Sequence, residues 1–313
     1  MKRHFILLDP LEKLSVKKDS TLLFAHTLKS EGIDCRLVFE QDLNFSNRAK
    51  STVFGYTFDS KLMENSVYLD KFELAGGELC ELGHDDVFHM RLDPPFDGRY
   101  LRYLWLLGAL QAQGVQVVND PAGVSRHNEK LYAYQNESSH PSFVGAGAKA
   151  LESFLESLAA VQTFVLKPLD LYQGIGVEKV ERAAVLERFK QKTQELNGPV
   201  IVQPYDRKVE SGEVRSIYFK GQEIGSILKT PPRGEFLANI ARGAEFKRYD
   251  LTQTERKLCD DVTKSLMKEG IDWVAFDLLG GMLSEVNITC PGLLVEVSQA
   301  YETNLAKKII GLL

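Results

Sequence analysis

The N-terminal region alternates between apolar runs of strand length and one run of helical length, and this alternation limits the folds open to the chain. Residues 5–8 and 35–39 are short and mostly apolar, whereas residues 22–28 suit a helix. A strand, a helix and a strand in succession favour parallel pairing, because a parallel neighbour needs a long crossover. The chain is therefore predicted to begin with a parallel α/β unit.

The rest of the N-terminal lobe is predicted to complete the same sheet. Residues 46–83 look less regular, and Gly76-Gly77 is interpreted as a turn between short β-like runs. A strand ends at residues 119–121, so the first domain is predicted to span residues 1–120. Its other predicted elements are strands at 87–90 and 115–118 and a helix at 100–110.

The middle of the chain contains a glycine loop between two predicted strands. Gly174 and Gly176 follow a strand at 163–166 and precede one at 177–180. Glycine loops of the Walker and Rossmann types open into a helix, so neither type is predicted here. The second domain is predicted to span residues 121–198, with helices at 128–134, 151–158 and 182–196.

The C-terminal part of the chain is mostly β-structure and forms the third predicted domain, residues 199–313. The predicted fold class is therefore α/β with α+β character, in which a parallel N-terminal lobe is followed by a mixed middle region and a mostly β C-terminal region. The predicted elements of the third domain are strands at 200–203, 214–219 and 224–228, a helix at 252–268, a strand pair around Asp277 and Glu285, and a terminal helix.

Length and composition restrict the number of domains and the class of partner. The chain has 313 residues, 44% of them hydrophobic, and single cores stop growing near about 250 to 300 residues, so more than one domain is expected. The formal net charge of -5 gives no global basic field, so nucleic acid is not expected as a partner. No apolar run reaches about 18 residues, so no membrane span is expected. Small molecules are the expected partners.

The cysteines and the N-terminus indicate the compartment. The four cysteines have no Cys-x-x-Cys spacing, which argues against a zinc cluster or a disulfide framework. The apolar run at 5–8 is too short for a signal peptide. We therefore expect a cytoplasmic protein with reduced thiols at Cys35, Cys80, Cys259 and Cys290.

Three polar residues near the C-terminus form the strongest local signal. Asp277 lies at the end of an apolar run, and Glu285 and Asn287 follow the Gly280-Gly281 turn. Because strand residues two apart face the same side, Glu285 and Asn287 are predicted to converge with Asp277. Carboxylate and amide oxygens are ligands that suit Mg²⁺. If the spacing is considered by itself, polar residues at the end of a hairpin explain it equally well.

Two lysines are candidate phosphate ligands. Lys167 follows the predicted strand 163–166 and Lys130 begins a helix, so each ammonium group can act as a point charge on a phosphate. A lone lysine is more often a solvated surface group, and Gly174 and Gly176 are more often plain turn residues. Together the lysines indicate a nucleotide cleft.

The segment 207–248 has a local excess of positive charge, with nine Lys or Arg against five Glu. Anionic ligands are one reason for such an excess, and a solvated loop is an equally good interpretation. Of the six histidines only His127 lies beside a candidate site, and no catalytic role is assigned to histidine.

Taken in order, these motifs resemble those of the ATP-grasp superfamily, and specifically those of the bacterial glutathione synthetase family. The resemblance spans nearly the whole chain, and its most specific parts are the proline-rich run and the final polar set. The matching motifs are Asp9-Pro10, Lys17-Lys18-Asp19-Ser20, Arg91 with Asp93-Pro94-Pro95-Phe96-Asp97, Asn128-Glu129-Lys130, Lys167-Pro168-Leu169-Asp170, and Asp277, Glu285 and Asn287.

The resemblance implies that ATP lies between two β-rich lobes and that two Mg²⁺ ions, or Mn²⁺ in their place, are held by Asp277, Glu285 and Asn287. It implies catalytic roles for Arg215, on the substrate carboxylate and the acyl phosphate, and for Lys167. The implied nucleotide ligands are Lys130, Lys167 and Gly174 at the phosphates, Gln203, Pro204 and Tyr205 at adenine, and Glu213 at the ribose. The implied substrate ligands are Asp19, Arg91, Arg215, Lys229, Asn239 and Arg242.

The implied reaction is ATP-dependent formation of a peptide bond through an acyl phosphate, with γ-glutamylcysteine and glycine as substrates. A related ligase that joins another amino acid, such as glutamate, to an amino acid or peptide is the alternative, and a nucleotide-binding protein without catalysis is a third. The sequence departs from the family at substrate loops. The departures are Leu171, Tyr172 and Gln173 in a loop that is glycine-rich in the family, Lys229 and Leu237 for arginines, Arg242 for a small residue, and Cys290 for serine.

The resemblance also implies a homo-oligomer, a tetramer in the family. The aromatic helix around residues 100–107 suits an interface and suits a buried helix equally well.

Overall fold

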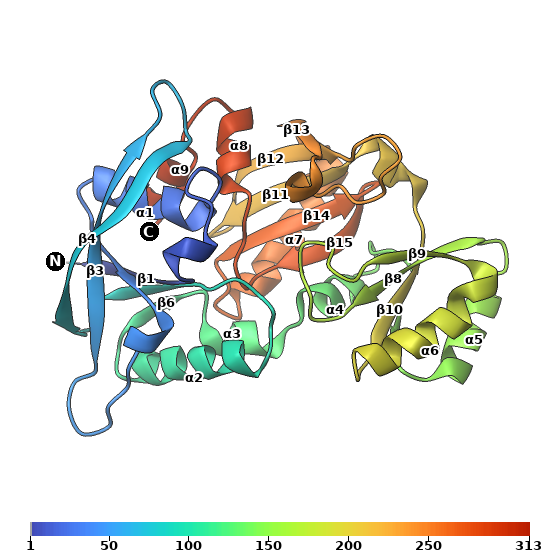
Figure 1. Cartoon of the computed structure of the whole chain (residues 1–313), viewed down its shortest axis with the longest axis horizontal. Coiled ribbons are helices and arrows are strands. Elements are labelled where there is room, and N and C mark those ends of the chain that lie inside the picture. The colour runs from blue at the N-terminus through green and yellow to red at the C-terminus, as the bar shows by residue number, and fades with distance from the viewer. Residues whose placement is uncertain (1) are drawn as a thin grey trace.

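The computed structural model describes residues 2–313, and their strands form three sheets (Figure 1). The six-stranded sheet has the order β4-β3-β2-β1-β5-β6, the four-stranded sheet β7-β10-β8-β9, and the five-stranded sheet β13-β12-β11-β14-β15. Figure 1 shows the first and second sheets at opposite ends of the molecule, with the third sheet between them.

The first sheet has a parallel centre, as the N-terminal pattern predicts. β1 pairs in parallel with both β2 and β5, and α1 supplies the crossover between β1 and β2. Both sheet faces are covered, which explains why these strands are nearly continuous apolar runs. The elements are β1 (Arg3–Leu8), α1 (Ser20–Ser30), β2 (Asp34–Val38), β3 (Thr52–Leu62), β4 (Leu69–Glu81), β5 (Val87–Arg91), α2 (Gly98–Ala112) and β6 (Gln116–Val118).

The prediction of irregular structure at residues 46–83 is wrong. β3 and β4 form a long antiparallel hairpin, and Gly76 and Gly77 lie inside β4, opposite Thr57 and Tyr56. Most of β4 is exposed, so it lacks the apolar alternation that marks a half-buried strand. Glycine fits at position 77 because a Cβ there would lie 2.4 Å from the Phe54 ring. The glycines are thus a site of close packing within the strand.

The second sheet carries its helices on the far side of the molecule from the first sheet. It is antiparallel throughout, and β10 pairs with both β7 and β8. The predicted domain boundary at residue 198 separates β10 from this sheet, so we propose that this lobe extends to about residue 204. The elements are β7 (Phe143–Gly145), α5 (Ala148–Ser157), β8 (Thr163–Pro168), β9 (Glu178–Glu181), α6 (Val185–Glu195) and β10 (Val200–Pro204).

The third sheet is antiparallel and shares a core with the first lobe. Apolar residues of α8, α9, α1 and the third sheet belong to one buried cluster. The elements are β11 (Glu213–Phe219), β12 (Gln222–Thr230), β13 (Glu245–Arg248), α7 (Gln253–Met267), β14 (Trp273–Leu279), β15 (Met282–Asn287), α8 (Leu294–Ala300) and α9 (Ala306–Ile310). Two short helices, α3 (Pro121–Arg126) and α4 (Glu129–Tyr134), connect the first and second lobes.

Short 3-10 helices complete the chain: η1 (Leu11–Lys13), η2 (Glu40–Asp42), η3 (Arg182–Ala184), η4 (Arg207–Ser211) and η5 (Ile240–Arg242). Within residues 2–313 there is no helix of the length and apolarity needed to cross a membrane.

Candidate functional site

The register of the third sheet brings charged residues from four strands onto one face. Arg215 on β11 lies opposite Asp277 on β14, and Asp277 lies opposite Glu285 on β15. Glu213 lies opposite Lys229 on β12. Directly paired strand residues share a face, so the predicted convergence of Asp277 and Glu285 is confirmed by the pairing.

Asp277 is the centre of this cluster. Arg215 donates to it through both Nε and Nη2, at 2.9 and 2.7 Å. Lys229 Nζ donates at 2.9 Å, and Asn287 Nδ2 donates at 3.2 Å. Burial raises the pKa of Asp277, but the Arg215 and Lys229 charges outweigh it and hold that pKa well below its usual range. The carboxylate is therefore ionised.

Lys229 joins Asp277 to a second, partly buried carboxylate. Its Nζ also contacts Glu213 Oε2 at 2.8 Å, and its side chain is only 6% exposed. Burial lowers the pKa of Lys229, whereas Asp277 and then Glu213 raise it above its usual value overall. The ammonium group thus stays charged between two carboxylates, which is how a buried charge is tolerated.

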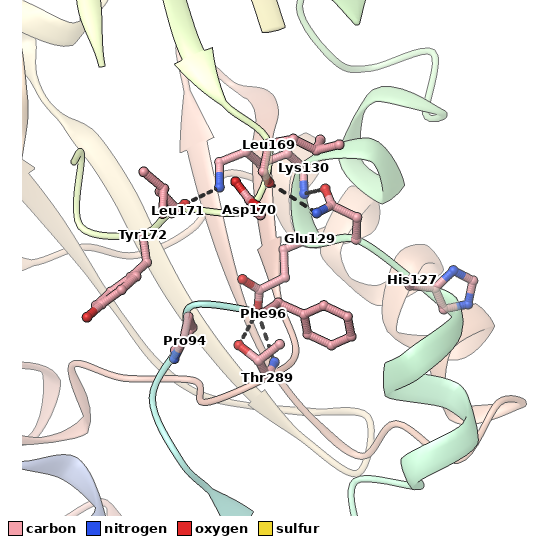
Figure 2. Close-up of a pocket in the computed structure, with 11 residues that line it drawn as sticks. Pro94, Phe96, His127, Glu129, Lys130, Leu169, Asp170, Leu171, Tyr172 and Thr289 are labelled. Carbon is pink, nitrogen blue, oxygen red and sulfur yellow. Dashed lines mark hydrogen bonds between the residues drawn. The ribbon is translucent and has the colours of Figure 1, made fainter. Parts of the chain in front are cut away.

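Lys130, at the start of α4, faces this cluster from the connection between the first two lobes. Its Nζ lies 3.0 Å from Glu285 Oε1 and donates to the Leu171 carbonyl at 2.6 Å. Asn128 caps the helix, accepting from the Lys130 and Leu131 amides. The cap fixes the first turn of α4, from which Lys130 extends (Figure 2).

Glu129 holds α4 against the end of β15, a contact that the sequence patterns did not reveal. Its Oε1 accepts from the Ile288 amide at 2.7 Å, the Thr289 amide at 2.9 Å and the Thr289 hydroxyl at 2.8 Å. Burial, followed by the neighbouring Glu285 charge, raises the pKa of Glu129. This carboxylate sets the distance between Lys130 and the strand that carries Glu285.

Lys167 lies within β8, because its pairing with β10 continues through Pro168. The prediction that it follows the strand is therefore wrong in detail. Burial lowers the pKa of Lys167, and the negative charges that act on it most strongly are those of Glu285 and then Glu213, so its side chain lies in the field of the same cluster. A phosphate beside this ammonium group would supply an opposing negative charge and offset the effect of burial on its pKa.

Three side-chain donors hold alternate carbonyls of the loop at residues 169–173. Asn128 Nδ2 donates to Leu169 at 3.1 Å, Lys130 Nζ to Leu171 at 2.6 Å and Asn239 Nδ2 to Gln173 at 2.7 Å. We call this loop the strap. Figure 2 shows its residues Leu169 to Tyr172 beside Lys130 at the start of α4.

The residue that follows the strap, Gly174, lies beside the loop before η5. Gly174 has φ of +72°, and a Cβ there would lie 3.1 Å from a Leu237 methyl group. Leu237, one departure from the family, therefore lies beside the glycine that follows the other departures at residues 171–173. Arg242 is exposed at the end of η5, the helix that Asn239 caps.

The strap closes one side of a narrow pocket (Figure 2). The opposite wall comes from the proline-rich run and from Thr289. The lining residues are Pro94, Phe96, His127, Asn128, Glu129, Lys130, Leu169, Asp170, Leu171, Tyr172 and Thr289.

The residues expected against adenine lie at the end of β10. Gln203 is buried and donates to Ser142 at 2.6 Å, and Pro204 ends the strand. The Tyr205 ring lies under the Lys179 ammonium at 3.8 Å and edge-on to Phe236. They form a partly apolar surface beside Lys167.

Two further expected substrate residues lie at the junction of the first and third lobes. Arg91 is 4% exposed and stacks on Trp273, with its guanidinium carbon 4.4 Å from the ring centroid. It donates to the Thr21 hydroxyl and the Pro291 carbonyl. Asp19 caps α1, and burial raises its pKa to about 6. Trp273 lies on β14, the strand that also carries Asp277.

The donor set at Asp277, Glu285 and Asn287 fits a hard divalent cation that takes further ligands from phosphate. Two carboxylates and an amide supply oxygens on adjacent strands, as Mg²⁺ prefers. Among the residues the structure describes, no group of three or more His, Cys, Asp or Glu side chains could hold a metal. Such an incomplete protein set is typical of Mg²⁺ bound with a nucleotide.

Comparison with known proteins relates the whole chain to one family. Residues 1–125 match the family described as prokaryotic glutathione synthetase, N-terminal domain, and residues 129–302 match prokaryotic glutathione synthetase, ATP-grasp domain. A glutathione synthetase of Parasynechococcus marenigrum is 30% identical over 98% of this chain and 97% of its own length. One from Coxiella burnetii is 28% identical over 98% and 95%.

Solved structures share the fold at low identity. The D-cycloserine synthetase DcsG superposes with a TM-score of 0.67 at 16% identity, covering 99% of both chains. A RimK domain ATP-grasp protein from Sphaerobacter thermophilus gives 0.60 at 14% identity, covering 98% of both. The expected ATP-grasp architecture is confirmed. The protein is an ATP-grasp ligase, an enzyme that uses ATP and a divalent metal to join a carboxylate to an amine. It belongs to the prokaryotic glutathione synthetase family and acts on small molecules.

Proposed function

We propose that the enzyme joins γ-glutamylcysteine to glycine, as the names of its relatives indicate. The observation that carries the proposal is the cluster around Asp277, where two carboxylates and an amide face Lys130 and Lys167. This arrangement suits the triphosphate of ATP with its metal.

The nucleotide would lie between the second and third sheets. Lys130 and Lys167 would hold the phosphates as point charges, with the Gly174 backbone beside them. Gln203, Pro204 and Tyr205 would contact adenine, and Glu213 would accept from the ribose hydroxyls. We propose that Asp277, Glu285 and Asn287 hold two Mg²⁺ ions, or Mn²⁺ in their place, and that these ions neutralise phosphate charge when bound.

The chemistry would proceed in two transfers. A carboxylate oxygen of γ-glutamylcysteine attacks the γ-phosphorus of ATP, and ADP leaves with the electron pair of the broken bond. The glycine amine then attacks the acyl carbon, inorganic phosphate leaves, and the nitrogen gives up its proton. Arg215, fixed by its paired bonds to Asp277, would place positive charge beside the acyl phosphate.

The strap would exclude water from the acyl phosphate, which water would otherwise hydrolyse. Its three anchors close it over α4, and Tyr172 lines the pocket beneath it. Exclusion of water by a closed loop is an established means of protecting reactive intermediates.

A ligase for another amino acid, such as glutamate, is the second candidate. The observation that favours it is that Leu237, a departure from the family, lies beside Gly174, the residue that follows the departures Leu171, Tyr172 and Gln173. On either candidate we propose that Asp19, Arg91, Asn239 and Arg242 contact the substrates. Family resemblance further supports a cytoplasmic homotetramer.

The two candidates are separated by a screen of ADP release. γ-Glutamylcysteine and other glutamyl compounds are crossed as donors with glycine and glutamate as amines. ADP release that depends on γ-glutamylcysteine and glycine together supports the first candidate. Release that requires glutamate as one partner supports the second, and no ADP release with any pair contradicts both.

A further inference from the structure

Lys229 reaches Asp277 by crossing an intervening strand. It starts on β12, pairs with Glu213 on β11, and extends over β11 to Asp277 on β14. Its Nζ lies 2.8 Å from Glu213 Oε2 and 2.9 Å from Asp277 Oδ1. With both contacts inside the cluster and a side chain 6% exposed, Lys229 is not placed to bind a substrate carboxylate.

Both oxygens of Asp277 accept hydrogen bonds from the protein. Oδ1 accepts from Arg215 Nε and Lys229 Nζ, and Oδ2 accepts from Arg215 Nη2 and Asn287 Nδ2. A divalent cation that coordinates Asp277 must therefore compete with a donor already in place. The Lys229 contact is the more easily displaced, because an ammonium group is a point charge whereas the Arg215 guanidinium is held in a paired fork.

The second candidate carboxylate is also neutralised from within the protein. Glu285 Oε1 lies 3.0 Å from Lys130 Nζ. A cation entering alone would meet Lys130, Arg215 and Lys229 at close range and would find both carboxylates paired. A nucleotide changes this balance, because its phosphates bring negative charge that pairs with the lysines and supplies oxygen ligands to the ion.

We propose that Lys229 is a positioning residue that serves as the internal counter-ion of Asp277, so that the divalent cation enters the site only together with the nucleotide. The inference rests on the metal role proposed above for Asp277 and Glu285. On this proposal Lys229, which stands where the family has an arginine, determines the order in which the nucleotide and the divalent cation bind. Lysine suits this role because a single ammonium group fits between two carboxylates while Arg215 occupies the bidentate face of Asp277.

The test measures Mn²⁺ affinity by the electron paramagnetic resonance signal of the free ion, with and without a non-hydrolysable ATP analogue. The unmodified enzyme is expected to bind Mn²⁺ at least about 100-fold more tightly with the analogue. Lys229→Met, which removes the charge at similar length, is expected to tighten nucleotide-free Mn²⁺ binding at least about 10-fold. Lys229→Arg retains the charge and is expected to keep nucleotide-free binding weak.

Lys220→Met is the matched control, because Lys220 follows β11 on the same sheet and donates to the Leu312 carbonyl. It should leave Mn²⁺ affinity unchanged. Unchanged or weaker nucleotide-free binding in folded Lys229→Met would overturn the proposal. So would equal Mn²⁺ affinity of the unmodified enzyme with and without the analogue, a result that needs no variant to fold. Neither measurement depends on turnover, so a different pair of substrates would leave the inference intact.

Discussion

The charges around Asp277 are balanced residue by residue. Arg215 and Lys229 carry two positive charges, and Asp277 and Glu213 carry two carboxylates within hydrogen-bond reach of them. Buried ions persist in proteins when they are paired in this way, because an unpaired buried charge is strongly destabilising. Removal of one of these four charged residues therefore affects both the binding site and the stability of the fold. The free energy of unfolding of each variant must be measured beside its activity.

Glu285→Gln tests the proposed metal site. The amide keeps the size of the side chain but loses the charge of a hard oxygen ligand, so metal-dependent turnover should fall by at least about 100-fold. Steady-state ADP release measured across Mg²⁺ concentrations checks this. Glu245→Gln on the exposed strand β13 is the control and should retain activity. Full activity of Glu285→Gln would remove the metal assignment.

Arg215→Ala tests the proposed catalytic role. Loss of the guanidinium removes positive charge beside the developing acyl phosphate, and kcat should fall by about 100-fold or more, with nucleotide affinity retained. Arg215→Lys should recover part of kcat but not the bidentate geometry. Turnover numbers and nucleotide titrations of both variants are the measurements. If only nucleotide binding weakens, Arg215 has a different role.

At the scale of elements, the strap links the lobes through its backbone. Its Leu169, Leu171 and Gln173 carbonyls are held by α4 and by the loop before η5. Lys130 is both a strap anchor and a proposed phosphate ligand. A nucleotide would compete with the strap for this lysine, so strap mobility and nucleotide binding should be coupled.

Asn239→Ala tests the anchor at the far end of the strap. It removes one hydrogen bond, typically about 1 kcal/mol, so cleavage after Leu171 or Tyr172 by chymotrypsin should be about 5-fold faster. Limited proteolysis followed by mass spectrometry measures this rate. Asn44→Ala is the control, because Asn44 is an exposed residue that donates to the Asp42 carbonyl. Equal cleavage of Asn239→Ala and the unmodified enzyme would show that this bond does not restrain the strap.

Elements defined by local pattern were predictable, and those defined by distant contacts were not. The strand, helix and strand of the N-terminus and the hairpin carrying Asp277 and Glu285 follow from apolar spacing and a glycine turn. The β3–β4 hairpin was missed because its exposed strand has no apolar face. The loop that forms the strap was singled out from its sequence, but its anchors were missed because these bonds join residues about 40 to 70 positions apart, and no periodicity in the sequence reports such pairs.

At the scale of the whole molecule, the first and third lobes share apolar clusters that join distant parts of the chain. The six-stranded sheet of the first lobe contains a buried histidine pair. His4 lies on β1 and His89 on β5, and two of their ring nitrogens are 2.9 Å apart. Burial lowers the pKa of His4 to about 4 and lowers that of His89 well below its usual value. Both rings are therefore neutral in the folded protein near neutral pH.

This pair makes stability depend on pH. In the unfolded chain each histidine binds a proton near pH 6.5, whereas the folded chain does not, so stability is lost as pH falls from about 6.5 towards 4. Between pH 7 and 5 the free energy of unfolding should fall by about 2 kcal/mol for each histidine. Urea unfolding at both pH values measures this loss. In the double variant His4→Gln, His89→Gln the loss should shrink; an equal loss in the double variant would contradict the account.

The central claim is that this ATP-grasp ligase activates a carboxylate as an acyl phosphate, and oxygen tracing tests it most directly. γ-Glutamylcysteine labelled with ¹⁸O in its cysteinyl carboxylate is turned over with ATP and glycine, and the inorganic phosphate is analysed by mass spectrometry. The account predicts one ¹⁸O atom in each phosphate released, because the carboxylate oxygen that attacks phosphorus leaves with it. Product formation with unlabelled phosphate would contradict the acyl-phosphate route.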